Sequence, residues 1–163
     1  MLRKIIKIIL LVIWMGVIFS FSSDNGTESK KKSEAVIVKT HEAITHEQLT
    51  TEQKDVLVEK TAYPVRKLAH FLEYLVFGIL VISLVSEYTE LNKKAIGICL
   101  LIYLLYPITD EFHQFFSDER TPKIVDIFVD MAGCIVGAHI YLTYQRIVRR
   151  IKDGRNKQKK AIS

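Results

Sequence analysis

Apolar residues in this chain are gathered into four long blocks that charged segments separate. A spanning helix needs about 20 mostly apolar residues, and each block approaches that length. A soluble helix bundle would carry a polar stripe along every helix, whereas residues 95–107 and 135–142 have none. The pattern therefore predicts an all-α integral membrane protein, a four-helix transmembrane bundle with spans at about residues 5–22, 67–86, 95–116 and 123–145.

A polar stretch at residues 23–63 separates the first two blocks, and it predicts a short polar extracytoplasmic segment. Residues 33–44 and 51–61 each have the pattern of a short amphipathic helix, and Thr50 and Thr51 are both placed to cap the second. Pro64 precedes the second block, so we expect it at the first helical position of that span, where its missing N–H costs nothing. The chain is otherwise expected to form a single membrane domain over residues 1–163.

Lysine and arginine decide the expected orientation. The tail at residues 146–163 is strongly basic, and short cytoplasmic flanks collect such residues. An even number of spans then places Arg3, Lys4 and Lys7 inside as well. Lys30–Lys32 do not fit this orientation, because it places them outside, close to the first span. Their long segment, however, carries acids that nearly balance its bases. The sequence predicts that both termini are cytoplasmic. The tail is expected to meet anionic lipid of the bilayer, and no nucleic-acid partner is expected.

The first block has a second interpretation, as a cleaved signal peptide. It follows a basic start, and Ser20-Phe21-Ser22 is a small-x-small site. Its apolar run is long for a signal, which favours a retained span. Cys99 and Cys134, the only cysteines, lie deep in apolar blocks, so we expect them to be buried packing residues rather than a disulfide.

Ionisable residues inside the blocks cluster at the predicted outer end of the bundle. Such groups cost about 2.5–3.5 kcal/mol each at the membrane midplane, so they must be paired, hydrated or bound to a ligand. Helical phase places Asp126, Asp130, Gly133 and Gly137 on one stripe, with the two glycines allowing close helix packing. The candidate pocket residues are Lys67, His70, Glu73, Tyr74, Asp110, Glu111, His113, Gln114, Arg120, Asp126 and Asp130.

Two interpretations of this cluster stay open. It can be a structural network in which Lys67, Arg66 and Arg120 neutralise the carboxylates, or a water-accessible pocket for a polar head group. Within the pocket interpretation, metal binding by His70, His113 and carboxylates is a further option. No HExxH or comparable ligand spacing, phosphate loop or nucleophile motif stands in the chain, so the sequence assigns no catalytic residue, no metal and no cofactor.

Four ordered motifs make the sequence similar to the VanZ-like family. These are Phe19-Ser20-Phe21-Ser22-Ser23, Arg66-Lys67-Leu68-Ala69-His70-Phe71-Leu72-Glu73-Tyr74, Asp110-Glu111-Phe112-His113-Gln114, and Arg120 followed by Asp126, Gly133 and Gly137. One departure is Asp130, where members of the family often carry Asn.

This resemblance implies a small bacterial inner-membrane protein. The namesake of the family is linked to low-level resistance to teicoplanin, a lipid-tailed glycopeptide, and the family has no settled biochemical activity. Two functions follow as expectations. One is a pocket that binds an amphiphile, such as a lipid-linked envelope precursor or a lipoglycopeptide, and alters its access. The other is a membrane-embedded enzyme that modifies a lipid or precursor head group, with His70 or His113 as acid–base.

Overall fold

Five helices account for the part of the chain that the computed structural model describes, residues 1–23, 26–116 and 123–162. They are α1 (Leu2–Ser22), α2 (Gly26–Thr45), α3 (Thr51–Val85), α4 (Lys93–Gln114) and α5 (Ile124–Ile162). Those same ranges contain no strand. Four of the helices, α1, α3, α4 and α5, are long and apolar enough to cross a membrane. The predicted all-α bundle of four spanning helices is confirmed.

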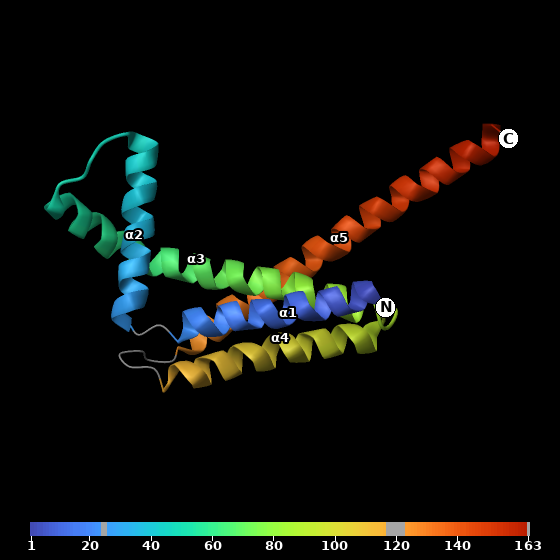
Figure 1. Ribbon diagram of the computed structural model, residues 1–163, viewed down its shortest axis with the longest axis horizontal. Helices are drawn as coiled ribbons and strands as arrows, with labels where there is room; N and C mark the ends of the chain where they lie inside the picture. The colour runs from blue at the N-terminus through green and yellow to red at the C-terminus, as the bar shows by residue number, and fades with distance from the viewer. Residues whose placement is uncertain (24–25, 117–122, 163) are drawn as a thin grey trace.

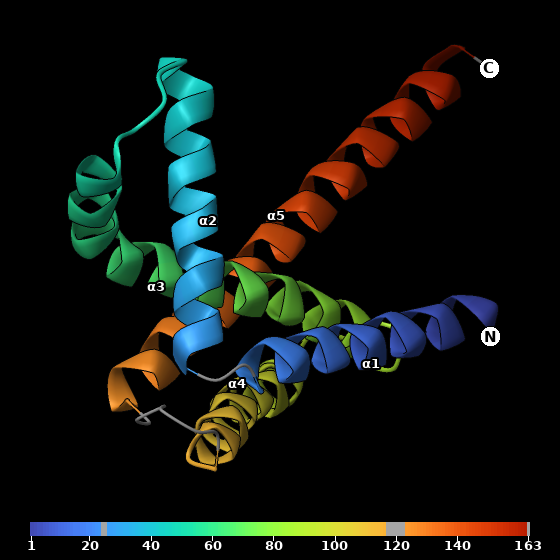
Figure 2. The same cartoon turned by 60° about the vertical axis from the view of Figure 1, so that its left-hand side comes forward.

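The four spanning helices form one bundle, and α2 stands across one end of it (Figures 1 and 2). The most extensive contact joins α3 to α5, while α1 packs on α3 and α4. Tyr74, Phe77 and Tyr103 lie in the core between these helices. Cys99 and Cys134 are free thiols in the same core, which confirms their predicted packing role. Most other apolar side chains face outward, as expected where lipid surrounds the bundle.

Helix α3 corrects the predicted boundaries, because it begins at Thr51 rather than at about residue 67 and contains Pro64 in its interior. Its start is the predicted cap: Thr50 Oγ1 accepts from Gln53 N, and Gln53 Oε1 accepts from Thr50 N. Once started, a helix gains one hydrogen bond for each residue added, so it can continue past a proline that removes a single bond. The result is a bend near the N-terminal end of α3 rather than a break (Figure 2).

Helix α2 also exceeds its prediction, since it begins at Gly26 instead of residue 33. It packs against the first turns of α3, with Ile37 and Val58 buried between the two helices. Glu42 and Lys54 form an ion pair 3.5 Å long across the same contact. The polar segment is therefore a helical hairpin whose second arm continues directly into a spanning helix.

The basic tail is a continuation of α5, which runs past the predicted span end near residue 145 to Ile162. It leaves the bundle as a straight helix (Figure 1). Lysine and arginine are good helix formers, so a charged segment directly behind a spanning helix can extend it.

A set of basic residues marks one end of the bundle, which we name the basic end. Lys7 Nζ donates to Ser83 O at 2.9 Å and to Glu87 at 2.5 Å, and Arg3 also pairs with Glu87. The Lys7 hydrogen bond holds the pKa of Glu87 below its usual value. The α3–α4 connection is thereby fastened to α1. Tyr141 of α5 reaches the same place through a 2.9 Å hydrogen bond with Ser86.

Candidate functional site

Polar side chains gather at the opposite end of the bundle, which we name the polar end. Here α1 and α4 end, α5 begins, and α3 passes beside α2. The buried polar residues at this end are Ser22, Asp110, Glu111, Gln114, Asp126 and Asp130. They come from three helices that are far apart in sequence, so tertiary packing assembles the cluster.

Glycines set how closely α3 and α5 approach each other at this end. A Cβ atom on Gly133 would overlap the carbonyl oxygen of Phe71, and one on Gly137 would overlap that of Leu75. From the other side, a Cβ on Gly78 would overlap backbone atoms of Cys134. This backbone-to-backbone contact holds the polar stripe of α3 against that of α5.

Lys67 of α3 and Asp126 of α5 form the first cross-helix pair. Their charged atoms are in direct contact, and the side chains are only 15% and 12% exposed. The Lys67 ammonium also lies 5.2 Å from the centre of the Tyr63 ring. This pair is a structural clamp between the two helices, of the kind that one interpretation of the sequence expected.

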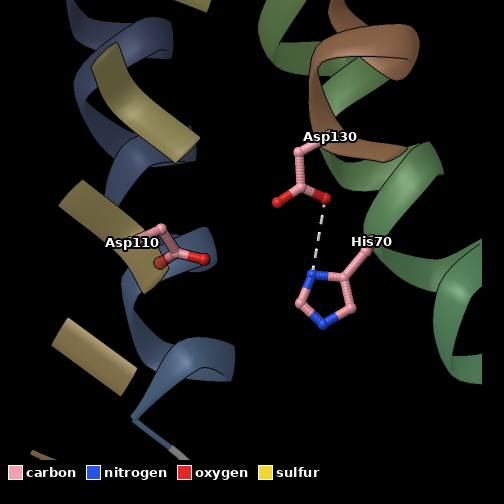
Figure 3. A group of neighbouring side chains, drawn as sticks. All are labelled: His70, Asp110 and Asp130. Carbon is pink, nitrogen blue, oxygen red and sulfur yellow. Dashed lines mark ion pairs between the residues drawn. The ribbon is translucent and has the colours of Figure 1, made fainter. Parts of the chain in front are cut away.

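One turn deeper, His70, Asp110 and Asp130 meet from three different helices. Figure 3 shows the three side chains projecting toward a common space, with His70 on α3, Asp110 on α4 and Asp130 on α5. His70 Nδ1 lies 3.6 Å from Asp130 Oδ1. One potential ligand atom from each residue lies within 4.8 Å of those from the other two.

The remaining candidates on α4 have separate partners. Glu111 accepts a 2.9 Å hydrogen bond from the backbone N–H of Lys123, which joins the end of α4 to the start of α5. Gln114 Nε2 donates to Asp110 Oδ2 at 3.2 Å. His113 faces α1, where its ring centre is 4.4 Å from that of Phe19. The structure thus places His113 outside the His70 cluster. Arg120 lies outside the described residues.

Two further candidates belong to α3. Tyr74 is completely buried beside the ring of Tyr106, so it packs the core directly below the cluster. The backbone carbonyl of Glu73 accepts a 2.9 Å hydrogen bond from Trp14 Nε1, which ties α1 to α3 at this level.

A cavity of about 250 Å³ opens beside the cluster, between the end of α1, α2, α3 and α4. Its lining is Ile18, Phe21, Ser22, Ser29, Lys32, Ser33, Val36, Val65, Arg66, Ala69, His70, Glu73 and Asp110. Only His70, Glu73 and Asp110 of these were among the candidate pocket residues. The contribution of α2 was missed, although Ser29, Ser33 and Val36 have the spacing of one helix face.

A comparison with protein families agrees with this architecture. The family model described as VanZ/LLP1 matches residues 7–148, a range that includes the polar end, all of α3 and α4, most of α1, and α5 up to residue 148. Among curated proteins and among solved structures, nothing matches the chain. A match over this much of the chain shows that it belongs to the VanZ/LLP1 family.

Proposed function

We propose that the cavity at the polar end binds the polar head of an amphiphile on the outer side of a bacterial cell membrane. By holding a lipid-linked envelope precursor or a lipoglycopeptide, the protein would alter the access of that bound molecule to the membrane surface. It would in this way contribute to low-level resistance to teicoplanin-type antibiotics.

The mixed lining of the cavity is the observation that carries this proposal. Ile18, Phe21, Val36 and Val65 give it an apolar side, while serines and charged side chains form the rest. Such a lining suits a molecule with a greasy and a polar part, because each part meets groups of its own kind. Lys32 and Arg66 are both in the lining, and cationic side chains of this type bind phosphate and carboxylate oxygens.

The orientation follows from the basic end. Arg3, Lys4 and Lys7 lie beside the α3–α4 connection, and α4 starts there with Lys93 and Lys94. Positive charge flanking spans favours the cytoplasmic side, so we propose that the basic end and both termini are cytoplasmic and the cavity faces out.

A pair of reporter fusions tests this orientation. A reporter that is active only in the cytoplasm should give a signal when fused after Ser163. The same reporter inserted between His46 and Glu47, in the α2–α3 connection, should stay silent. Intact protein with the opposite pattern of signals would show that the cavity faces the cytoplasm.

Filling the cavity is the direct test of the proposed binding function. Ser33→Trp places an indole in the lining from α2, and Thr40→Trp adds the same side chain to an exposed position on the same helix. We expect Ser33→Trp to remove any glycopeptide tolerance that the wild type confers at equal protein abundance, and Thr40→Trp to retain it. Full tolerance in both variants would exclude this cavity as the binding site.

An enzyme acting on a lipid head group is the second candidate, and the position of His70 favours it. The ring lines the cavity and also faces the carboxylate of Asp130, an arrangement suited to acid–base chemistry. Conservative His70→Gln and Asp110→Asn changes separate the two candidates in the same assay. Loss of phenotype with normal folding supports chemistry, whereas tolerance of both changes together with sensitivity to Ser33→Trp supports binding alone.

A further inference from the structure

Asp130 has an unusual environment for a carboxylate in a membrane protein. Its side chain is completely buried, and within the described residues neither carboxylate oxygen has a hydrogen-bond partner. His70 Nδ1 lies 3.6 Å from Asp130 Oδ1, which is too long for a hydrogen bond. Ionised carboxylates at such positions are paired, hydrogen-bonded or bound to a metal.

The surroundings of Asp130 add further negative charge. Asp110, Glu111 and Glu73 lie close enough to repel its charge, and the positive charge of Lys67 opposes them. Lys67 is itself in direct contact with Asp126. A cation at the centre of the His70 cluster would therefore lower the electrostatic energy of this end of the bundle.

The separation of the three donors fits a metal ion. Zinc binds histidine nitrogen and carboxylate oxygen at about 2.0–2.2 Å, which places tetrahedral ligands about 3.4 Å apart. The His70–Asp130 separation of 3.6 Å is close to that value. All three donors lie within 4.8 Å of one another, so closing the site needs shifts of only about an ångström.

The orientation of Asp110 agrees with the same role. Gln114 Nε2 holds Asp110 Oδ2 by a 3.2 Å hydrogen bond, which fixes the direction in which the carboxylate points. Metal-binding carboxylates are commonly oriented in this way by a neighbouring donor.

We propose that His70, Asp110 and Asp130 bind one divalent first-row metal ion, of the Zn²⁺ or Mn²⁺ class, at the inner wall of the cavity. One imidazole and two carboxylates form a donor set that suits these ions better than Cu(I) or an iron–sulfur cluster, which need sulfur ligands. Three protein ligands leave a coordination position open, and His70 and Asp110 line the cavity. Metal binding by these three residues does not depend on the proposed amphiphile function. Only the further step, in which an oxygen of the bound head group becomes the fourth ligand, rests on that function.

Direct metal binding tests the site. The full chain, purified in detergent with a tag that contains no histidine, is stripped with a chelator and titrated with Zn²⁺, Mn²⁺ and Co²⁺. We expect one tight equivalent per chain, a raised melting temperature, and for Co²⁺ the visible absorption of a tetrahedral site. His70→Gln and Asp130→Asn should each weaken binding at least about 100-fold, more than loss of an outer-shell partner does.

His113→Gln is the matched control, because this histidine lies at the same end but against Phe19. It should bind the ions as the wild type does. Asp130→Asn keeps the shape of the side chain and removes a buried charge, so the metal-free variant should fold; if it does not, His70→Gln gives the same information. Absence of binding to the folded wild type, or unchanged binding in His70→Gln and Asp130→Asn, would overturn the site. Ser33→Trp leaves the three metal ligands in place, so this variant should still bind the metal ion. The tolerance assay on Ser33→Trp therefore tests the amphiphile proposal separately from the metal site.

Discussion

Gly137→Ala is expected to lower the free energy of unfolding by about 3 kcal/mol, at the upper end of the usual effect of overpacking. The added methyl group would overlap the backbone carbonyl of Leu75, and a backbone atom cannot rotate away as a side chain can. The two helices must therefore separate, which weakens the contact that places α3 against α5. Thermal or denaturant unfolding in detergent micelles measures the effect.

Gly97→Ala provides the control within another spanning helix. A Cβ atom at Gly97 would meet nothing within 4 Å, and the residue is exposed. Alanine is favoured over glycine in a helix by roughly 0.5–1 kcal/mol, so this variant should be as stable as the wild type or slightly more stable. Equal stability of the Gly137 and Gly97 variants would show that α3 and α5 do not pack through these glycines.

Asp126→Asn is expected to destabilise the protein by roughly 2–3 kcal/mol, because it leaves the Lys67 ammonium without its carboxylate in a mostly buried position. Removing one partner of a fully buried pair typically costs about 3–5 kcal/mol, and the slight exposure of both side chains reduces that value. Lys67→Met should destabilise the protein by a similar amount, because it leaves the Asp126 carboxylate without its ammonium partner. The double variant Lys67→Met/Asp126→Leu should recover much of the loss, since no unpaired charge remains.

A double-mutant cycle with unfolding measured in detergent gives the coupling between the two residues. The surface pair Glu42–Lys54 is the matched comparison, because its side chains are 31% and 41% exposed. Glu42→Gln should change stability by less than about 1 kcal/mol. If the stability changes of the Lys67 and Asp126 single variants add up to that of the double variant, the two charges act independently. That result would contradict the proposed clamp between α3 and α5.

The sequence by itself determined the class of the fold and the inward faces of the helices. Spans are read from apolar length, because a bilayer leaves backbone groups no partner outside a helix. Faces are read from helical phase, which is a local property of the backbone. The predicted stripe of Asp126, Asp130, Gly133 and Gly137 is buried on α5.

Only the tertiary structure decided which partners meet. Lys67 and His70 are about one turn apart on α3, as Asp126 and Asp130 are on α5, so an axial shift of about one turn would pair Lys67 with Asp130 or His70 with Asp126 instead. The backbone contact at Gly133 and Gly137 sets that offset. Such a contact joins residues far apart in the chain, and no local pattern encodes it.

The same reason explains the parts of the site that the sequence did not predict. Pro64 was expected to begin a helix, but α3 is one continuous helix that contains Pro64 in its interior. The first turns of α3, before Pro64, pack against α2. This continuation brings Ser29 and Ser33 of α2 to the cavity. Sequence alone also treated His70 and His113 alike, whereas helix rotation points one at Asp130 and the other at Phe19. Residue types and periodicity describe one helix at a time, and a pocket depends on how several helices are rotated and offset against each other.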